Sequence, residues 1–258
     1  MDLELQGKTV LVTGGSKGIG LACAKAFAAE GAHLAIASRS ETNLADARAV
    51  LKSAFTVAAD LSDSGAAARV VDRVEDGLGP IDILVNSAGA ARRTAPNELT
   101  PNAWRAAMDA KYFTYVHVID PVVKRMAARG RGVIVNIIGN GGKVAAATHL
   151  PGGAANAALM LVTVGLANAY AARGVRVVGI NPGLTNTGRV AEGLKAEAAL
   201  LGVSEAEALQ RSLERVALGR MAEPEEIASM TVFAASARAS YLTGVVIAMD
   251  GASSPIVI

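Results

Sequence analysis

Short apolar runs recur along the whole chain, and Ala-rich stretches of helical length separate most of them. The repetition of strand, helix and strand predicts a parallel sheet with right-handed crossovers. Helices that pack closely on both faces of such a sheet need a core of small and aliphatic residues. We therefore expect an α/β fold, a doubly wound parallel sheet with helices on both faces. The expected strands lie in TVLVTG, HLAIAS, FTVAAD, DILVNSAG, GVIVNII, VRVVGINPG and VVIAMDG.

Pro and acidic residues mark the starts of several expected helices. Pro101 follows Thr100, and EPEEIASMTVFAAS opens with Pro and acids before apolar residues at helical spacing. The stretch from about 189 to 218 is rich in Ala, Glu and Leu, and it predicts one or two helices that lie over a site as a lid. Because no Pro-rich or low-complexity linker divides the chain, residues 1–258 are expected to form one domain.

The composition agrees with a single aliphatic domain. Hydrophobic residues make up 52% of the 258 residues and aromatic residues only 3%, so Ala, Val, Leu and Ile must build the core. A net charge of +2, without any basic run, argues against nucleic acid as a partner. The single cysteine, Cys23, excludes an internal disulfide and a multi-cysteine metal site. We expect no metal, and we expect Cys23 to be a small core residue.

The chain shows no pattern typical of secretion or of a membrane span. Its first residues, MDLELQGKTV, lack the basic start and apolar run of a signal peptide. The longest apolar stretch, 157–167, is shorter than the roughly 20 residues that a spanning helix needs. We therefore expect a soluble, cytoplasmic protein without a membrane partner.

A Gly-rich turn follows the first expected strand and opens a helix. Gly14, Gly18 and Gly20 would let the backbone turn tightly, approach a pyrophosphate and pack the helix on the sheet. Their spacing, G-x3-G-x-G, differs from the commoner dinucleotide pattern G-x-G-x-x-G. Taken alone, three glycines are a weak signal, because such a segment can also be a simple turn.

Four ordered motifs make the signal stronger. TGGSKGIG, NSAG, NPGLTNT and GRMAEPEEIASMTVFAASARASYLTGVVIAMDG together resemble the short-chain dehydrogenase/reductase family over essentially the whole chain. The resemblance implies a single dinucleotide-binding domain of Rossmann type. It also implies cofactor contacts from the Gly-rich turn, the ends of the third and fourth strands and the NPGLTNT loop. These residues are Gly14, Ser16, Lys17, Gly18, Ile19, Gly20, Asp60, Leu61, Asn86, Ala88, Gly89, Pro182, Gly183, Thr185 and Thr187.

The charge at the end of the second expected strand bears on the choice of cofactor. An acidic residue there would accept hydrogen bonds from the adenosine 2′-hydroxyl, whereas a cation favours a 2′-phosphate. This chain has Arg39 at that place and Lys17 in the Gly-rich turn. We therefore expect NADP(H) rather than NAD(H), although each cation could also be an ordinary solvated charge.

The reactive residues of the family are missing. By the resemblance, its Ser, Tyr, Lys and Asn positions fall on Gly139, Gly152, Asn156 and Lys111. Carbonyl reduction needs a proton donor for the developing alkoxide, and glycine has no side chain to supply one. The usual proton relay of the family therefore cannot operate here.

Other residues could replace it. Lysine and asparagine look exchanged between positions 111 and 156, which lie near each other in this fold, and a desolvated Lys111 could exchange a proton. His149 precedes the vacant tyrosine position and has a reference pKa suited to acid–base work. Lys111, Asn156 and His149 are thus the catalytic candidates, against the alternatives that Lys111 is a solvent-facing lysine and His149 an exposed loop residue. Tyr112 is expected to pack.

Three functions remain open at this point. The first is an NAD(P)(H)-dependent oxidoreductase of the short-chain type, with a non-standard proton relay, acting on an unidentified carbonyl or alcohol. The second is non-redox carbonyl chemistry on the same fold, and the third is a catalytically inactive nucleotide-binding subunit. The substrate is expected to be a small molecule, an apolar or bulky carbonyl or alcohol compound rather than a polyanion. The resemblance implies a homotetramer or homodimer formed through helices at 104–129 and 154–172.

Overall fold

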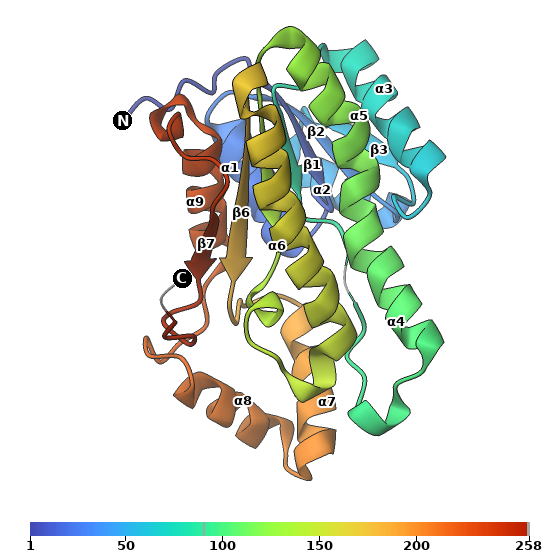
Figure 1. Cartoon of the computed structure of the whole chain (residues 1–258), viewed down its shortest axis with the longest axis vertical. Helices are drawn as coiled ribbons and strands as arrows, with labels where there is room; N and C mark the ends of the chain where they lie inside the picture. The colour runs from blue at the N-terminus through green and yellow to red at the C-terminus, as the bar shows by residue number, and fades with distance from the viewer. Residues whose placement is uncertain (90, 257–258) are drawn as a thin grey trace.

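Seven parallel strands form one sheet in the computed structural model, which describes residues 1–89 and 91–256 (Figure 1). Their order across the sheet is β3-β2-β1-β4-β5-β6-β7, so all seven expected strands are confirmed. Sequence order reverses between β1 and β4, which is the switch point of a doubly wound sheet. The strands are β1 (Thr9–Thr13), β2 (His33–Ser38), β3 (Phe55–Ala58), β4 (Ile83–Asn86), β5 (Gly132–Ile137), β6 (Val175–Pro182) and β7 (Val246–Met249).

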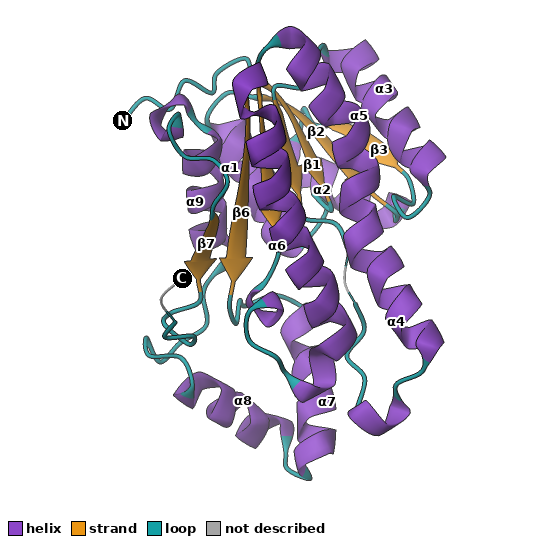
Figure 2. Cartoon of the chain, in the orientation of Figure 1, coloured by secondary structure: helices purple, strands orange, loops and turns teal. Residues whose placement is uncertain are grey.

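Helices cover both faces of this sheet (Figure 2). The helices α3, α5 and α6 pack on one face, and α1, α2 and α9 pack on the other. The fold is therefore a single α/β domain of Rossmann type, as expected. The helices are α1 (Gly18–Ala29), α2 (Glu41–Leu51), α3 (Ser64–Leu78), α4 (Pro101–Ala107), α5 (Thr114–Arg129), α6 (Leu150–Tyr170), α7 (Arg189–Leu201), α8 (Glu205–Glu214) and α9 (Pro224–Ala235). Shorter helical segments are η1 (Pro96–Glu98), η2 (Met108–Phe113), η3 (Asn140–Gly142), η4 (Ala147–His149), η5 (Ala171–Arg173) and η6 (Ala237–Ala239).

Successive side chains of each strand point to opposite faces of the sheet, which divides the core into two layers. In β1, Leu11 points into the cluster under α3 and α5, whereas Val10 and Val12 point into the cluster under α1 and α9. All three side chains are fully buried, so the sheet is covered on both sides. Cys23 belongs to the second cluster, and burial raises its pKa to about 12. The prediction that Cys23 is a small core residue is confirmed.

The helix starts follow the expected capping chemistry. The Thr100 hydroxyl accepts a hydrogen bond from the Ala103 backbone N–H at 3.2 Å, directly before Pro101. At the start of α9, Glu223 and Glu226 form a reciprocal capping box around Pro224. The segment predicted to hold one or two helices contains α7 and α8, which extend beyond the carboxyl ends of the strands (Figure 1).

The longest helix is apolar over most of its length. By length and composition, the stretch 147–173 could span a membrane, with a mean hydropathy of 1.5. The sequence expectation considered only the run 157–167, whereas this mean is taken over an 18-residue window of the helix. Two polar residues of α6, Asn156 and Thr163, are buried, and α6 packs along β6. We interpret α6 as a core helix of the sheet.

A substitution at Gly20 tests the close packing of α1 on the Gly-rich turn. A Cβ atom at residue 20 would lie 2.2 Å from the backbone oxygen of Gly14, so the turn would have to move. Gly20→Ala is expected to lower the free energy of unfolding by about 1–3 kcal/mol. The matched control is Gly188→Ala, because no atom lies within 4 Å of a Cβ atom there. It should change stability by less than about 0.5 kcal/mol in the same denaturant titration, and equal losses in both variants would contradict the packing.

Candidate active site

The Gly-rich turn lies against the loop that follows β4. Gly14 has φ +67°, and a Cβ atom there would lie 2.7 Å from both the Ser87 oxygen and the Ala88 Cα. Only glycine fits this approach without moving backbone. Gly89 is equally constrained, with φ +95° and a Cβ position only 2.0 Å from the Ala110 oxygen. Gly14, Ala88 and Gly89, all predicted site residues, therefore lie together in one tightly packed corner at the carboxyl ends of β1 and β4.

A buried line of polar side chains runs under this corner. The Thr13 hydroxyl donates to Asn86 Oδ1 at 3.3 Å and accepts the backbone N–H groups of Ser87 and Ala88. Asn86 Nδ2 donates to Asn136 Oδ1 at 3.0 Å. Asn136 Nδ2 then donates to Thr163 Oγ1, also at 3.0 Å. The line thus connects β1, β4, β5 and α6, and it makes Asn86 a structural support of the corner.

Unpaired cations lie beside the Gly-rich turn. The Ser16 hydroxyl donates to Ser38 Oγ at 2.9 Å, which ties the turn to the end of β2 next to Arg39. Arg39 and Lys17 are exposed, and neither makes an ion pair or a side-chain hydrogen bond within the described part of the chain. Asp60 is also exposed; hydrogen bonds from Ser62, together with the charge of Arg39, lower its pKa.

The loop after β6 approaches the Gly-rich turn from the other side. The Cγ2 atom of Thr187 lies 3.5 Å from the position of a Cβ atom on Gly18, whose φ is +54°. The Thr185 hydroxyl instead donates to the Gly183 backbone oxygen at 3.2 Å, so it is occupied within its own loop. Of the two threonines, Thr187 is therefore the one placed beside the turn.

The remaining expected cofactor residues support these segments. Leu61 and Pro182 are buried, while Ile19 is partly buried against the core. The site as a whole offers a glycine cradle that a Cβ atom would fill, two unpaired cations at one end and a threonine loop at the other. These features fit a dinucleotide whose pyrophosphate lies at the amino end of α1.

Lys111 is buried, which excludes the alternative of a solvent-facing lysine. It lies in η2, a π-helical segment between α4 and α5, and only 8% of its surface is exposed. Its Nζ donates to the Tyr115 hydroxyl at 2.7 Å and to the Ile137 backbone oxygen at 2.9 Å. Tyr115 is fully buried and its hydroxyl donates to the same oxygen. The amine is therefore fixed at the carboxyl end of β5.

This environment changes the acidity of the amine. Burial, followed by the charge of Arg189, lowers the pKa of Lys111 to about 7. Burial raises the pKa of Tyr115, so its phenol stays protonated at neutral pH. The existing hydrogen bonds of Nζ use two of its N–H groups. The third position can hold a proton or a lone pair without breaking either bond, so the amine can exchange a proton in place.

Asn156 lies at the same strand end. Its Nδ2 is 3.1 Å from the position of a Cβ atom on Gly139, two residues beyond the Ile137 oxygen that holds Lys111. The two side chains thus flank the end of β5, in agreement with the expected proximity of positions 111 and 156. The Asn156 side chain makes no hydrogen bond to any described residue, even though Asn156 is buried, with only 5% of its surface exposed. Its amide is available to another partner.

His149 occupies the space beside Gly152, the position at which the resemblance places a tyrosine. A Cβ atom on Gly152 would lie 2.1 Å from the imidazole Cε1, so the ring needs a glycine there. Burial, together with the charges of Arg93, Arg189 and Lys111, lowers the pKa of His149 to about 4. A histidine that is neutral at pH 7 is a poor acid but can donate a hydrogen bond. The alternative of an exposed loop histidine does not apply, because the residue is half-buried.

Sequence reasoning missed three side chains at this site. Tyr115 follows Lys111 by one helical turn, a spacing that could have been noticed. Arg93 and Arg189 lie in a loop and at the first residue of α7, where no periodic pattern marks a residue as facing a site. Tyr112 packs against the core as expected.

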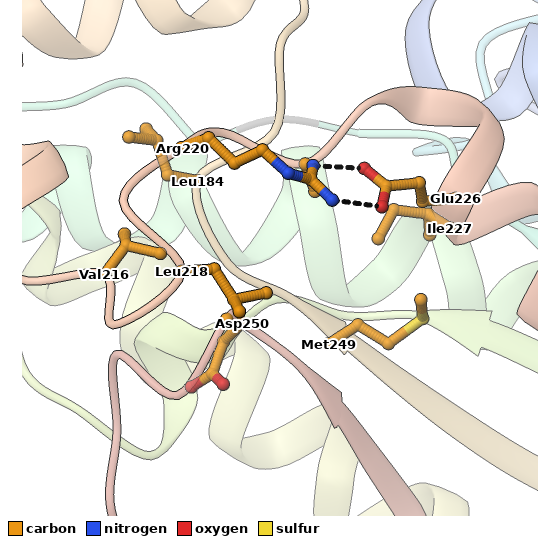
Figure 3. A pocket seen from close by; sticks show the side chains of 10 residues that line it. Leu184, Val216, Leu218, Arg220, Glu226, Ile227, Met249 and Asp250 are labelled. Atoms are coloured by element: carbon orange, nitrogen blue, oxygen red, sulfur yellow. Dashed lines mark hydrogen bonds and ion pairs between the residues drawn. The ribbon is translucent and has the colours of Figure 1, made fainter.

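A separate pocket of about 140 Å³ lies behind the loop after β6, between Leu184, Val216 and Met249 (Figure 3). Arg220 and Glu226 close one side through two hydrogen bonds of 2.7 and 2.8 Å. The catalytic candidates do not line this pocket. It is therefore distinct from the site at the end of β5.

Comparison with known proteins decides the family. The model of the short chain dehydrogenase family matches residues 8–198. The chain belongs to the short-chain dehydrogenase family. Gluconate 5-dehydrogenase of Gluconobacter oxydans is 32% identical, over 96% of this chain and 95% of the relative. Cis-4-hydroxycyclohexanecarboxylate dehydrogenase of Sinomonas cyclohexanicum is 34% identical, over 95% of each chain.

Solved structures agree with this assignment. The L-sorbose reductase of Gluconobacter frateurii, complexed with NADPH and L-sorbose, matches with a TM-score of 0.91 at 31% identity over 100% of both chains. An actinorhodin polyketide ketoreductase with NADPH matches with the same TM-score at 29% identity, over 95% of this chain and 96% of that one. The chain thus has the fold of the short-chain oxidoreductases along its full length. Within residues 1–89 and 91–256, no group of three or more His, Cys, Asp and Glu residues could hold a metal ion.

Proposed function

We propose that this protein is an NADP(H)-dependent short-chain oxidoreductase that interconverts a carbonyl and an alcohol with Lys111 as its proton-exchanging group. The observation that carries the proposal is the amine of Lys111, held at the end of β5 with a pKa of about 7. A group of this pKa can give or take a proton near neutral pH. The substrate itself is unidentified.

Each part of the chain has a defined task in this proposal. A bound reduced nicotinamide supplies the hydride. Lys111 holds the proton that the developing alkoxide takes up, directly or through a water. The unpaired amide of Asn156 and the neutral imidazole of His149 border the same space, and either can donate a hydrogen bond to the reacting oxygen. Tyr115 is a positioning residue, because its hydroxyl touches only Lys111 and the Ile137 oxygen.

We prefer this function to the two alternatives for a physical reason. An inactive nucleotide-binding subunit would not need a desolvated amine at the nicotinamide end, and a non-redox enzyme would not need the two cations at the adenosine end. Burying a lysine without an acidic partner is costly, so its retention in the site supports a chemical role.

The preference for NADP(H) over NAD(H) is also a proposal. Arg39 and Lys17 support it, because both are exposed, unpaired within the described residues and next to the Gly-rich turn. We further propose that α7 and α8 act as a lid, and that the protein is a soluble, cytoplasmic homodimer or homotetramer. Leu161, 75% exposed on α6, and Trp104, 40% exposed on α4, support an interface at these helices.

Calorimetric titration with the two reduced nicotinamides tests the cofactor. NADPH is expected to bind at least about tenfold more tightly than NADH, because Arg39 can form charge-assisted hydrogen bonds with the 2′-phosphate. Arg39→Ala should remove most of this difference and leave NADH binding unchanged. Arg73→Ala, an exposed arginine on α3, is the matched control. Equal binding of both cofactors to the wild type would contradict the preference, and binding of neither would end the oxidoreductase proposal.

The pH dependence of turnover tests the role of Lys111. Ketone reduction needs the protonated amine, so its kcat should fall as pH rises through about 7, while alcohol oxidation should rise. Lys111→Met should lower kcat by about 100-fold or more and remove this dependence. Tyr115→Phe should move the midpoint to lower pH, because the ammonium loses a hydrogen-bond acceptor.

Lys25→Met, which changes an exposed lysine on α1, is the control for charge and should leave the profile unchanged. Absorbance of the reduced nicotinamide follows the reaction in all four proteins. If Lys111→Met retained the wild-type profile, the proton would have to come from another group.

A further inference from the structure

Two arginines border the candidate site without an acidic partner. Arg93 follows β4, and Arg189 is the first residue of α7. Neither forms an ion pair with any side chain among residues 1–89 and 91–256. The acidic residue whose charge acts on Arg93 is Glu197, and the one whose charge acts on Arg189 is Glu192. Glu197 already pairs with Arg215 at 2.6 Å, so it is not free to neutralise Arg93.

The contacts of the two guanidinium groups place them between three segments. Arg93 Nη1 donates to the Thr148 hydroxyl at 3.3 Å, next to His149. Its Nε lies 2.9 Å from the position of a Cβ atom on Gly193 in α7. Arg189 Nη2 donates back to the Ala91 backbone oxygen at 3.4 Å. The pair therefore connects the loop after β4, the entrance to α6 and the first turn of α7.

Arg93 and Arg189 are both exposed, yet the surrounding protein partly desolvates the two guanidinium groups and lowers the pKa of each. Their charges also act on the catalytic candidates. After burial, the charges of Arg93 and Arg189 contribute to the low pKa of His149, and that of Arg189 to the low pKa of Lys111. A bound anion would offset the repulsion among these basic groups.

We propose that Arg93 and Arg189 hold an oxyanion of the substrate, a carboxylate or a phosphoryl group, while its carbonyl faces Lys111. Guanidinium groups bind both oxyanions through paired hydrogen bonds, and each arginine here makes only one side-chain hydrogen bond among the described residues. The proposal rests on the proposed oxidoreductase function and adds the substrate class to it. It also replaces the sequence expectation of an apolar substrate, which rested on the segments 139–153 and 189–210, gave no weight to Arg189 at the start of the second segment and left out Arg93.

Two matched pairs of ketones test the charge requirement. They are 4-oxopentanoate with its methyl ester, and dihydroxyacetone phosphate with dihydroxyacetone. Calorimetric titration of the wild type, with and without saturating NADP⁺, should show at least one anion binding about tenfold or more tightly than its neutral partner. The pair that shows this difference identifies the carboxylate or the phosphoryl group. Equal binding within both pairs, or no binding of either anion, would overturn the proposal.

Variants assign the effect to the two arginines. Arg93→Ala and Arg189→Ala should each reduce the preference for the anion at least about tenfold, and Arg189→Lys should restore part of it. Arg92→Ala is the matched control, because Arg92 is exposed, adjacent in sequence and outside the contacts described above. An anion preference that persists in both alanine variants would contradict the assignment.

NADP⁺ binding separates this proposal from the function on which it rests. All four arginine variants should bind NADP⁺ as the wild type does. If the wild type binds no NADP⁺ but still prefers the anions through Arg93 and Arg189, the anion site stands and the oxidoreductase function fails. If NADP⁺ binds and the anions gain nothing, the function stands and the substrate class is wrong.

Discussion

A buried line of hydrogen bonds determines where the site of this protein can be. Thr13, Asn86, Asn136 and Thr163 are all fully buried, and each satisfies the polar group of the next. Losing one member would leave a buried donor or acceptor unpaired, at a cost of about 1–3 kcal/mol. The line holds the carboxyl ends of β1, β4 and β5 together and ties the middle of α6 to them. The Gly-rich turn, the Ile137 oxygen and the first turns of α6 are consequently held around one space.

The chemistry that fills this space differs from that of the family pattern. Where the pattern has a tyrosine assisted by a lysine, this chain has a glycine at 152, an imidazole packed against it and an asparagine at 156. The lysine lies instead on the π-helical segment, bonded to Tyr115 and to the end of β5. Lysine and tyrosine are again one helical turn apart, but the lysine is the group near the site and the tyrosine is its buried support. In the proposed function, this reversal gives the fixed amine the role that a phenol has in the family pattern.

The sequence was informative where local patterns decide the structure. Strands, helix starts and the Gly-rich turn could be predicted, because aliphatic runs, Thr100 with Pro101 and the glycine spacing each carry a local physical signal. The buried position of Lys111 could not, because an isolated lysine is usually solvated and only the tertiary packing around η2 removes it from water. Arg93 and Arg189 were missed for a similar reason. Loop residues converge on a site through tertiary contacts that no spacing encodes.

The central claim is that the amine of Lys111 exchanges a proton near neutral pH. Its most direct test is an NMR titration of the lysine side chains in the NADP⁺-saturated protein, with Lys111 assigned by comparison with Lys111→Met. The account gives a midpoint near 7 for Lys111, because the amine is desolvated and has no acidic partner among the described residues. A midpoint near the ordinary lysine value of about 10.4 would contradict the account, since such an amine would stay charged throughout turnover.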